Sequence, residues 1–193
     1  EQIKPRTDLR GVTAVQLMGN IGPTASDIDA VELSRTLAQR LGGAYYTINA
    51  PAIAQDRSAR DLFLDHEHNR FVWDSFASLE VALVGIGTLE ESAFIARGVL
   101  SADDLAGLRR AGAVGEICGR YFDARGRECQ SAYRDRVISI DLDRLRRCPD
   151  VVVVTNGPRR EAAVRAALAG ELVKSLVIDE RGARALLSRE EAA

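Results

Sequence analysis

The sequence predicts an α/β fold with a doubly wound, mostly parallel sheet, from a repeated order of apolar run, small-residue turn and helical segment. Apolar runs at residues 12–17, 81–86 and 151–154 each end in glycine or other small residues, and a helical pattern follows each run. The chain has 193 residues, of which 46% are hydrophobic, and this suits one globular domain with a full core. The strand order does not follow from these patterns.

The elements are predicted in order from hydrophobic periodicity and turn residues. The expected strands cover residues 12–17, 44–48, 81–86, 151–154 and 175–178, with a candidate strand at residues 137–140. The expected helices cover residues 27–41, much of 52–79, 89–97, 101–110, 141–147, 160–169 and 179–187. Residues 112–126 are rich in glycine and are predicted to be irregular. The run at 81–86 is almost free of polar residues, so we expect that strand to be covered on both faces.

Several helix ends carry their own signals. Ser26 or Asp27 is expected to cap the first helix, and the glycines after Leu41 end it. Ser58 and Asp61 are candidate starts in the charged region at residues 52–79. Ser101 is expected to cap the helix that ends at Arg110, since acidic residues in its first turn favour the positive helix end.

Composition excludes several classes of protein. The formal net charge of −2 provides no basic field for nucleic acid, and no apolar run is long enough to cross a bilayer. No signal peptide is visible. The cysteines, Cys118, Cys129 and Cys148, are odd in number and lack metal-site spacing, which indicates a reduced, cytoplasmic setting. We expect no cofactor and no metal; the His-x-His pair at residues 66 and 68 is interpreted as part of a solvated charged stretch.

Loops at the carboxyl ends of parallel strands gather at one edge of a sheet, where ligands bind. Three such loops contain glycine, amide or hydroxyl residues, and the third also carries Arg159 and Arg160. Their candidate ligand-binding residues are Gly19 and Asn20, then Gly85, Gly87 and Thr88, then Asn156, Gly157 and Arg160. Backbone N–H groups at helix starts and a guanidinium favour an anion, so the pattern predicts a site for a small anion such as a phosphate.

An ordered set of motifs extends over nearly the whole chain: VQLMGN, VALVGIGT, GVLSADDL, GAVGEICGRYFD, DRVISIDLDRL, VVVVTNGPRREAAVRAAL and LVIDERGARALL. Together they resemble the sugar-binding (effector) domain of the SorC/DeoR-type bacterial transcriptional regulators. The resemblance implies a Rossmann-like fold related to glucosamine-6-phosphate deaminase and ribose-5-phosphate isomerase. It also implies binding of a sugar or sugar phosphate, assembly into homodimers or homotetramers, and contact with DNA through a separate helix-turn-helix domain.

Two departures from the family shape the expected domain organisation. The sequence contains no helix-turn-helix, so DNA binding requires a domain absent here. The strand and helix that usually open the family's effector domain are also absent. We therefore expect a lead-in over residues 1–11 and an effector-binding domain over residues 12–193, in a protein that does not contact membranes.

The resemblance also implies roles for individual residues. Arg160 stands where the family has a lysine that holds the effector's phosphate, and Glu116 stands where the family has an aspartate that accepts bonds from sugar hydroxyls. Met18 stands where deoxyribose-5-phosphate-sensing members carry an imine-forming lysine, and methionine cannot perform that chemistry. Read without the family, Arg160 is also compatible with a solvated helix start, Glu116 with a helix cap, and the loop at Gly87 with a plain turn.

Three functions remain open at this point. The first is an effector-sensing domain that transmits ligand binding through oligomer geometry, without catalysis. The second is a sugar-phosphate isomerase or deaminase of the related fold, although the deaminases' Asp-Gly-His is replaced by Thr88, Leu89 and Glu90, and only Glu90 or Glu91 offers a base. Here these two glutamates are expected to cap a helix and would repel an anion that they faced. The third is an oligomerisation module.

The arginines at residues 144, 146 and 147 are expected to be solvated, and Trp73 and Phe76 to pack in a core or interface.

Overall fold

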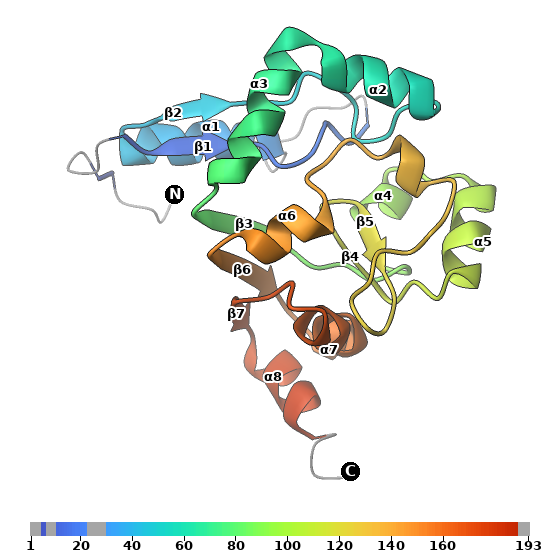
Figure 1. The fold of residues 1–193 in the computed structure, drawn as a ribbon. Helices are drawn as coiled ribbons and strands as arrows, with labels where there is room; N and C mark the ends of the chain where they lie inside the picture. Colours follow the sequence, from blue (N-terminus) through green and yellow to red (C-terminus); the bar gives the residue numbers. More distant parts are fainter. Residues whose placement is uncertain (1–4, 7–10, 23–29, 189–193) are drawn as a thin grey trace.

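The computed structural model describes residues 5–6, 11–22 and 30–188 of the chain. Its strands are β1 (Thr13–Val15), β2 (Ala44–Tyr46), β3 (Val81–Gly85), β4 (Gly115–Ile117), β5 (Arg120–Phe122), β6 (Asp150–Thr155) and β7 (Ser175–Ile178). Strand β1 pairs in parallel with β2, and β3, β6 and β7 form a parallel sheet in that order. Figure 1 shows β1 and β2 in the upper part of the view and β6 and β7 in the lower part, with helices around both.

Helices connect the parallel strands, as the sequence predicts. The α-helices are α1 (Ala30–Leu41), α2 (Arg57–Asp65), α3 (Glu67–Ser75), α4 (Ala93–Ala96), α5 (Ala102–Arg110), α6 (Leu142–Arg147), α7 (Glu161–Ala169) and α8 (Glu180–Leu187). Short 3-10 turns are η1 (Phe76–Ser78), η2 (Arg134–Arg136) and η3 (Pro158–Arg160). The predicted α/β class is therefore confirmed. None of the described helices is long and apolar enough to span a membrane.

The helix ends follow the capping residues closely. Asp141 and Asp179 each accept a bond from the backbone of the first turn, in α6 and α8 respectively. Ser101 caps α5 in a full capping box with Asp104, as predicted. Helix α1 ends at Leu41, and the next residue, Gly42, has a φ of +66°, which suits glycine. The proposed caps Ser26 and Asp27 lie outside the described residues.

The charged region at residues 52–79 contains two helices and the turn η1. Neither Ser58 nor Asp61 starts α2; the cap is Asp56, whose carboxylate accepts a bond from the Ala59 N–H at 2.8 Å. His66 separates α2 from α3, and His68 Nε2 lies 2.9 Å from the Thr47 carbonyl oxygen. The prediction that this region is mostly helical is therefore confirmed, whereas the predicted starts of its first helix are wrong.

The prediction that residues 112–126 are irregular is wrong. Strands β4 and β5 form an antiparallel hairpin with Ile117 opposite Arg120. Its two-residue turn has positive φ at both Cys118 (+50°) and Gly119 (+74°), which is the type I′ arrangement. Cys-Gly is an unusual sequence for this turn, where Asn-Gly is the common signal, so the hairpin escapes recognition. The candidate strand at residues 137–140 forms only isolated bridges, from Val137 to Ile53 and from Ser139 to Met18.

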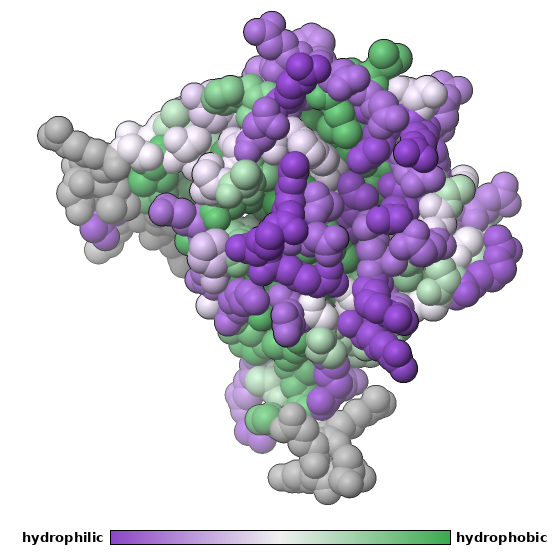
Figure 2. Space-filling model, in the orientation of Figure 1, coloured by the Kyte–Doolittle hydropathy of each residue, from purple (hydrophilic) through white to green (hydrophobic). Residues whose placement is uncertain are grey.

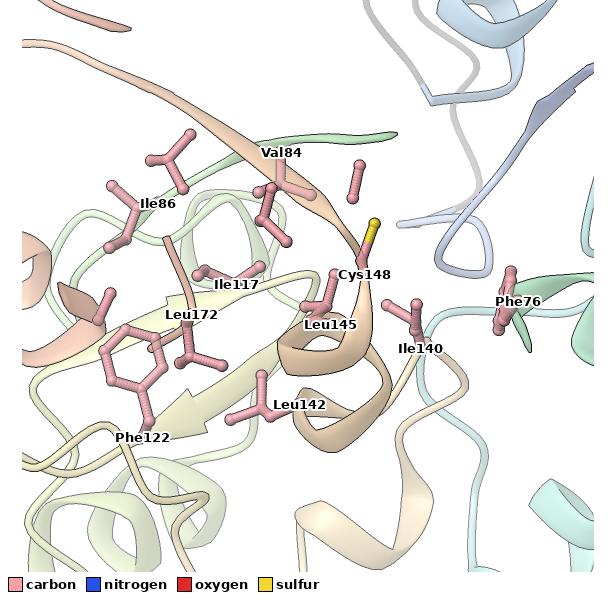
Figure 3. Close-up of a cluster of buried hydrophobic side chains, with 14 of the residues drawn as sticks. Phe76, Val84, Ile86, Ile117, Phe122, Ile140, Leu142, Leu145, Cys148 and Leu172 are labelled. Carbon is pink, nitrogen blue, oxygen red and sulfur yellow. The ribbon is translucent and has the colours of Figure 1, made fainter. Parts of the chain in front are cut away.

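The main core lies between the three-stranded sheet, the hairpin and helices α6 and α7. Figure 3 shows Val84 and Ile86 near Ile117, and Leu142 and Leu145 of α6 near Leu172. A second cluster packs α4 and α5 against the hairpin and the segment before α6; it includes Leu89, Phe94, Leu108, Tyr121, Tyr133 and Val137. The hairpin thus contributes Ile117 and Phe122 to the first cluster and Tyr121 to the second.

The three-stranded sheet is covered on one face by described residues, and the prediction that β3 is covered on both faces is wrong. Ala82 and Val84 are buried, whereas Val81 and Leu83 are 58% and 62% exposed. The exposed apolar face continues through Val154 and Val177 on the neighbouring strands. Figure 2 shows hydrophobic surface in the lower part of the molecule, where Figure 1 places β7 and α8. No described residue covers the alternate side chains of β3.

Arg144 and Arg146 of α6 make structural contacts and are not simply solvated, whereas Arg147 is exposed as predicted. Arg144 donates to the carbonyl of Trp73 at 3.0 Å and lies 5.5 Å from the centre of its ring. Arg146 donates to the carbonyls of Gly126 and Gly170. Phe76 is buried in the main core and Trp73 packs against that core, as predicted, with the two ring centres 5.2 Å apart.

Candidate functional site

The end of β3 meets the hairpin at Gly87 and Glu116. The two residues exchange backbone hydrogen bonds in both directions, each at 3.0 Å. A Cβ on Gly87 would lie 2.7 Å from Glu116 Oε1, so the absence of a side chain at position 87 gives the carboxyl group its place. The structure therefore brings together two of the predicted site residues, from segments far apart in the sequence.

Burial raises the pKa of Glu116 to about 7. A bond that its Oε2 accepts from the Gly119 N–H at 2.8 Å, and the positive charge of Arg160, both act in the opposite direction. Near neutral pH the carboxyl group can therefore donate as well as accept a hydrogen bond. Such a group suits hydroxyl groups, which also donate and accept.

Arg160 closes η3, directly before α7, and its guanidinium is only partly engaged. Its Nη1 donates to Asn156 Oδ1 at 2.9 Å, which links two predicted site residues across one turn. Its Nε lies 4.0 Å from Glu91 Oε2 and is buried without a hydrogen-bond partner among the described residues. Leaving a buried donor unpaired costs free energy. A ligand atom that accepts a hydrogen bond from Arg160 Nε would therefore stabilise the complex.

A second buried polar atom without a described partner lies on the same segment. Thr155 is the last residue of β6 and is 7% exposed, and its Oγ1 makes no hydrogen bond to the described residues. Two unpaired buried groups, Thr155 Oγ1 and Arg160 Nε, thus stand at either end of the turn that contains Asn156 and Gly157. Thr155 was not among the predicted site residues, because strand periodicity alone does not show that its hydroxyl lacks a partner.

Thr88 and Glu91 form the other side of this region. Thr88 is buried, and its Oγ1 accepts a bond from the Glu91 N–H at 3.0 Å. Glu91 does not cap a helix, since α4 begins at Ala93. Its carboxylate instead pairs with Arg159 Nη1 at 2.8 Å and faces Arg160. Glu91 was expected to cap a helix; instead its carboxylate faces the two arginines.

The third loop offers less free backbone than its sequence predicts. Gly157 has a φ of +77°, which favours glycine, and its N–H donates to Asp179 Oδ1 at 2.8 Å. The same carboxylate oxygen caps α8 through the Gly182 N–H. Gly85 is the last residue of β3 and faces the exposed side of the sheet, opposite Val154.

The first loop is anchored separately. Gly19 donates to the Ile138 carbonyl, and a side chain there would collide with the carbonyl of Pro51. The Asn20 side chain accepts a bond from Gln16 Nε2 at 3.2 Å. Arg97, just after α4, donates to the Ile21 carbonyl at 2.8 Å and ties this loop to the region after β3. No described contact joins Gly19 or Asn20 to Glu116 or Arg160, so the structure does not bring this loop together with the other predicted site residues.

Burial raises the pKa of Cys118 to about 12, and Cys118, Cys129 and Cys148 are free thiols. Among residues 5–6, 11–22 and 30–188, no group of at least three histidine, cysteine, aspartate or glutamate residues is placed to hold a metal. Asp123 forms an Asx-type turn by accepting bonds from the N–H groups of Arg125 and Arg127.

The fold and the polar groups at the strand ends define an α/β ligand-binding domain with an incompletely paired arginine beside a carboxyl group. A family model described as "Putative sugar-binding domain" matches residues 1–188, and the chain belongs to this family.

Curated relatives are regulators of transcription. The deoxyribonucleoside regulator of Bacillus subtilis (strain 168) is 28% identical over 189 residues, which cover 97% of this chain and 60% of the relative. The uncharacterized transcriptional regulator YjhU of Escherichia coli (strain K12) is 30% identical over 185 residues, which cover 94% of this chain and 55% of the relative. The chain thus spans less than two thirds of the length of these relatives.

Solved structures agree on the fold. The full-length sorbitol operon regulator SorC of Klebsiella pneumoniae superposes with a TM-score of 0.88 at 24% identity, over 95% of this chain and 59% of that one. A DeoR family transcriptional regulator from Listeria monocytogenes gives a TM-score of 0.85 at 25% identity, over 96% of this chain and 72% of that one. The fold expected from the resemblance is therefore confirmed.

Proposed function

We propose that this chain is the effector-binding domain of a DNA-binding transcriptional regulator and that it binds a sugar or sugar phosphate at the strand ends. The observation that carries the proposal is the buried Nε of Arg160, in the turn after β6, which has no hydrogen-bond partner among the described residues. A phosphate oxygen would satisfy that donor, and a guanidinium binds phosphate through parallel N–H bonds. Membership of a sugar-binding family and the names of the relatives support the proposal.

Each residue of the candidate site receives a role in this proposal. Arg160, held by Asn156, binds the anionic group, and Thr155 Oγ1 supplies a second bond. Glu116, whose carboxyl group lies against Gly87, binds hydroxyl groups of the sugar. Thr88 and Gly157 shape the surrounding turns, Gly85 leads into them, and Gly19 and Asn20 border the sugar.

The signal would pass to DNA through parts of the protein outside this sequence. A ligand shifts an equilibrium only by its different affinities for the two arrangements. We infer that the ligand favours one spacing of subunits in a homodimer or homotetramer and that attached DNA-binding domains respond to this spacing. Isomerase or deaminase activity has less support, because the curated relatives quoted above are named as regulators.

Calorimetry tests the proposal with pentose, hexose and polyol phosphates and their unphosphorylated forms. We expect Arg160→Ala to weaken binding of the phosphorylated ligand about ten- to hundredfold, since a charge-assisted hydrogen-bond pair is lost. The matched control is Arg125→Ala, because Arg125 is an exposed arginine in the loop after β5. Equal affinity in both variants would remove Arg160 from the site. Turnover of ribose 5-phosphate or glucosamine 6-phosphate would favour the enzyme instead.

A further inference from the structure

The arginines of the candidate site face a carboxylate from another loop. Glu91 Oε1 pairs with Arg159 Nη1 at 2.8 Å, and Glu91 Oε2 lies 4.0 Å from the buried Nε of Arg160. The second distance is too long for a hydrogen bond, and Arg160 Nε has no other described acceptor. The Glu91 carboxylate therefore faces both arginines but makes no hydrogen bond to Arg160 Nε.

Glu91 belongs to the loop that follows β3. Its own N–H donates to Thr88 Oγ1, directly after Gly87, and its neighbour Ser92 accepts a bond from the Tyr121 hydroxyl at 2.9 Å. The ion pairs of Glu91 therefore join the loop after β3 to the turn after β6. Both belong to the edge where the proposed ligand binds.

We propose that Glu91 takes the place of the ligand's anionic group in the ligand-free protein and that a phosphate displaces it on binding. This inference rests on the proposed function, because it uses the same arginines. Glu91 then selects for phosphorylated ligands, since a neutral sugar offers nothing that competes with a carboxylate for a guanidinium. Displacement also frees the loop after β3, which connects ligand binding to a change in that loop.

The charges favour this exchange. A carboxylate carries one negative charge, whereas a phosphate monoester carries about −1.5 to −2 near pH 7 and has three acceptor oxygens. Arg159 is 84% exposed, so its pair with Glu91 is well screened and easily opened. Arg160, at 26% exposed, gains more from a phosphate oxygen that reaches its unpaired Nε.

The test compares Glu91→Gln, which keeps the side-chain size, with Glu90→Gln, since Glu90 is the exposed neighbour with the same charge. Inorganic phosphate is the probe, titrated at constant ionic strength with thermal unfolding as the readout. We expect Glu91→Gln to lower the half-saturating phosphate concentration about three- to tenfold. Glu90→Gln should match the wild type. The wild type, but not Glu91→Gln, should discriminate strongly against sulfate analogues of lower charge such as methyl sulfate.

A second readout needs no ligand. Phenylglyoxal modifies accessible guanidinium groups, and peptide mass spectrometry reports the rate at Arg159 and Arg160. Glu91→Gln should speed their modification in the ligand-free protein, and Glu90→Gln should not. Equal rates in the two variants would overturn the inference.

The pattern of results separates this inference from the proposed function. If phosphate stabilises the wild type, Arg160→Ala weakens the effect and Glu91→Gln does not strengthen it, then the role of Glu91 is refuted and the anion site stands. If phosphate stabilises none of the proteins, or stabilises Arg160→Ala as well as the wild type, then both are refuted.

Discussion

Arg120 and Glu128 form a buried ion pair, with Nη1 and Oε1 3.0 Å apart and both side chains largely hidden from solvent. Arg120 also donates to the hydroxyl and carbonyl oxygens of Ser139. One guanidinium thus joins β5 to the segment before α6. We expect Arg120→Met to destabilise the fold by about 3–5 kcal/mol, because it leaves the largely buried Glu128 carboxylate with Arg134 as its one arginine partner among the described residues. Urea denaturation measures this loss.

The control for that measurement is Arg127→Ala, since Arg127 pairs with Asp123 at the surface and is 67% exposed. A loss below about 1 kcal/mol is expected there. A double change, Arg120→Met with Glu128→Leu, should recover much of the stability, because it removes both charges from the interior. If the double variant is as unstable as the single one, the cost comes from packing rather than from the unpaired carboxylate.

Gly126 and Gly170 approach backbone to backbone. A Cβ on Gly126 would lie 2.5 Å from the Gly170 Cα, and Gly126 has a φ of +70°. Gly126→Ala should therefore cost about 2 kcal/mol or more in unfolding free energy, from both collision and backbone strain. Gly107→Ala is the matched control, because it lies within α5 with open space around it. That change should stabilise the protein by about 0.5–1 kcal/mol.

The elements whose signals are local could be predicted from the sequence. Ser101 caps α5 as predicted, and Asp141 and Asp179, predicted as the first residues of their helices, are the N-caps of α6 and α8. The hairpin at β4–β5 was missed, because its turn uses Cys118, which rarely adopts positive φ. The exposed face of β3 was also missed, because an apolar run does not show how many of its faces are covered.

The candidate site was likewise predicted only in part. Loops and motifs predicted four of its residues, and the fold joins them in two hydrogen-bonded pairs: Gly87 with Glu116, and Asn156 with Arg160. The pairing of Glu91 with Arg159 could not be predicted, because it joins loops after different strands. Such contacts depend on the strand order and on side-chain direction, and a single sequence gives neither.

Because the described residues bury one face of the sheet, substitutions on its two faces should differ in their cost to stability. Leu83 is 62% exposed on β3, whereas Val153 on β6 is fully buried. Val153→Ala should cost about 2 kcal/mol, while Leu83→Ala should cost less than about 1 kcal/mol in this chain. Chemical denaturation of both variants measures the difference. A loss at Leu83 as large as that at Val153 would mean that the exposed face is covered in solution.

Glu116 should make the stability of the domain depend on pH in a recognisable direction. Its pKa is raised from 4.5 to about 7 in the folded state, mainly by burial, so the folded protein keeps a proton that the unfolded chain releases. Below pH 4.5 both states are protonated and the contribution of Glu116 to stability is complete. As the pH rises toward 7 this contribution is progressively lost, by about 1–3 kcal/mol.

Glu116→Gln carries no titrating group and should lack this loss. Other carboxylates with lowered pKa, such as Asp104 and Asp179, act in the opposite direction in both proteins, so the difference between the two stability curves isolates Glu116. Parallel curves for wild type and Glu116→Gln between pH 4.5 and pH 7 would show that Glu116 titrates normally, and its role as a hydrogen-bond donor to the ligand would then fail.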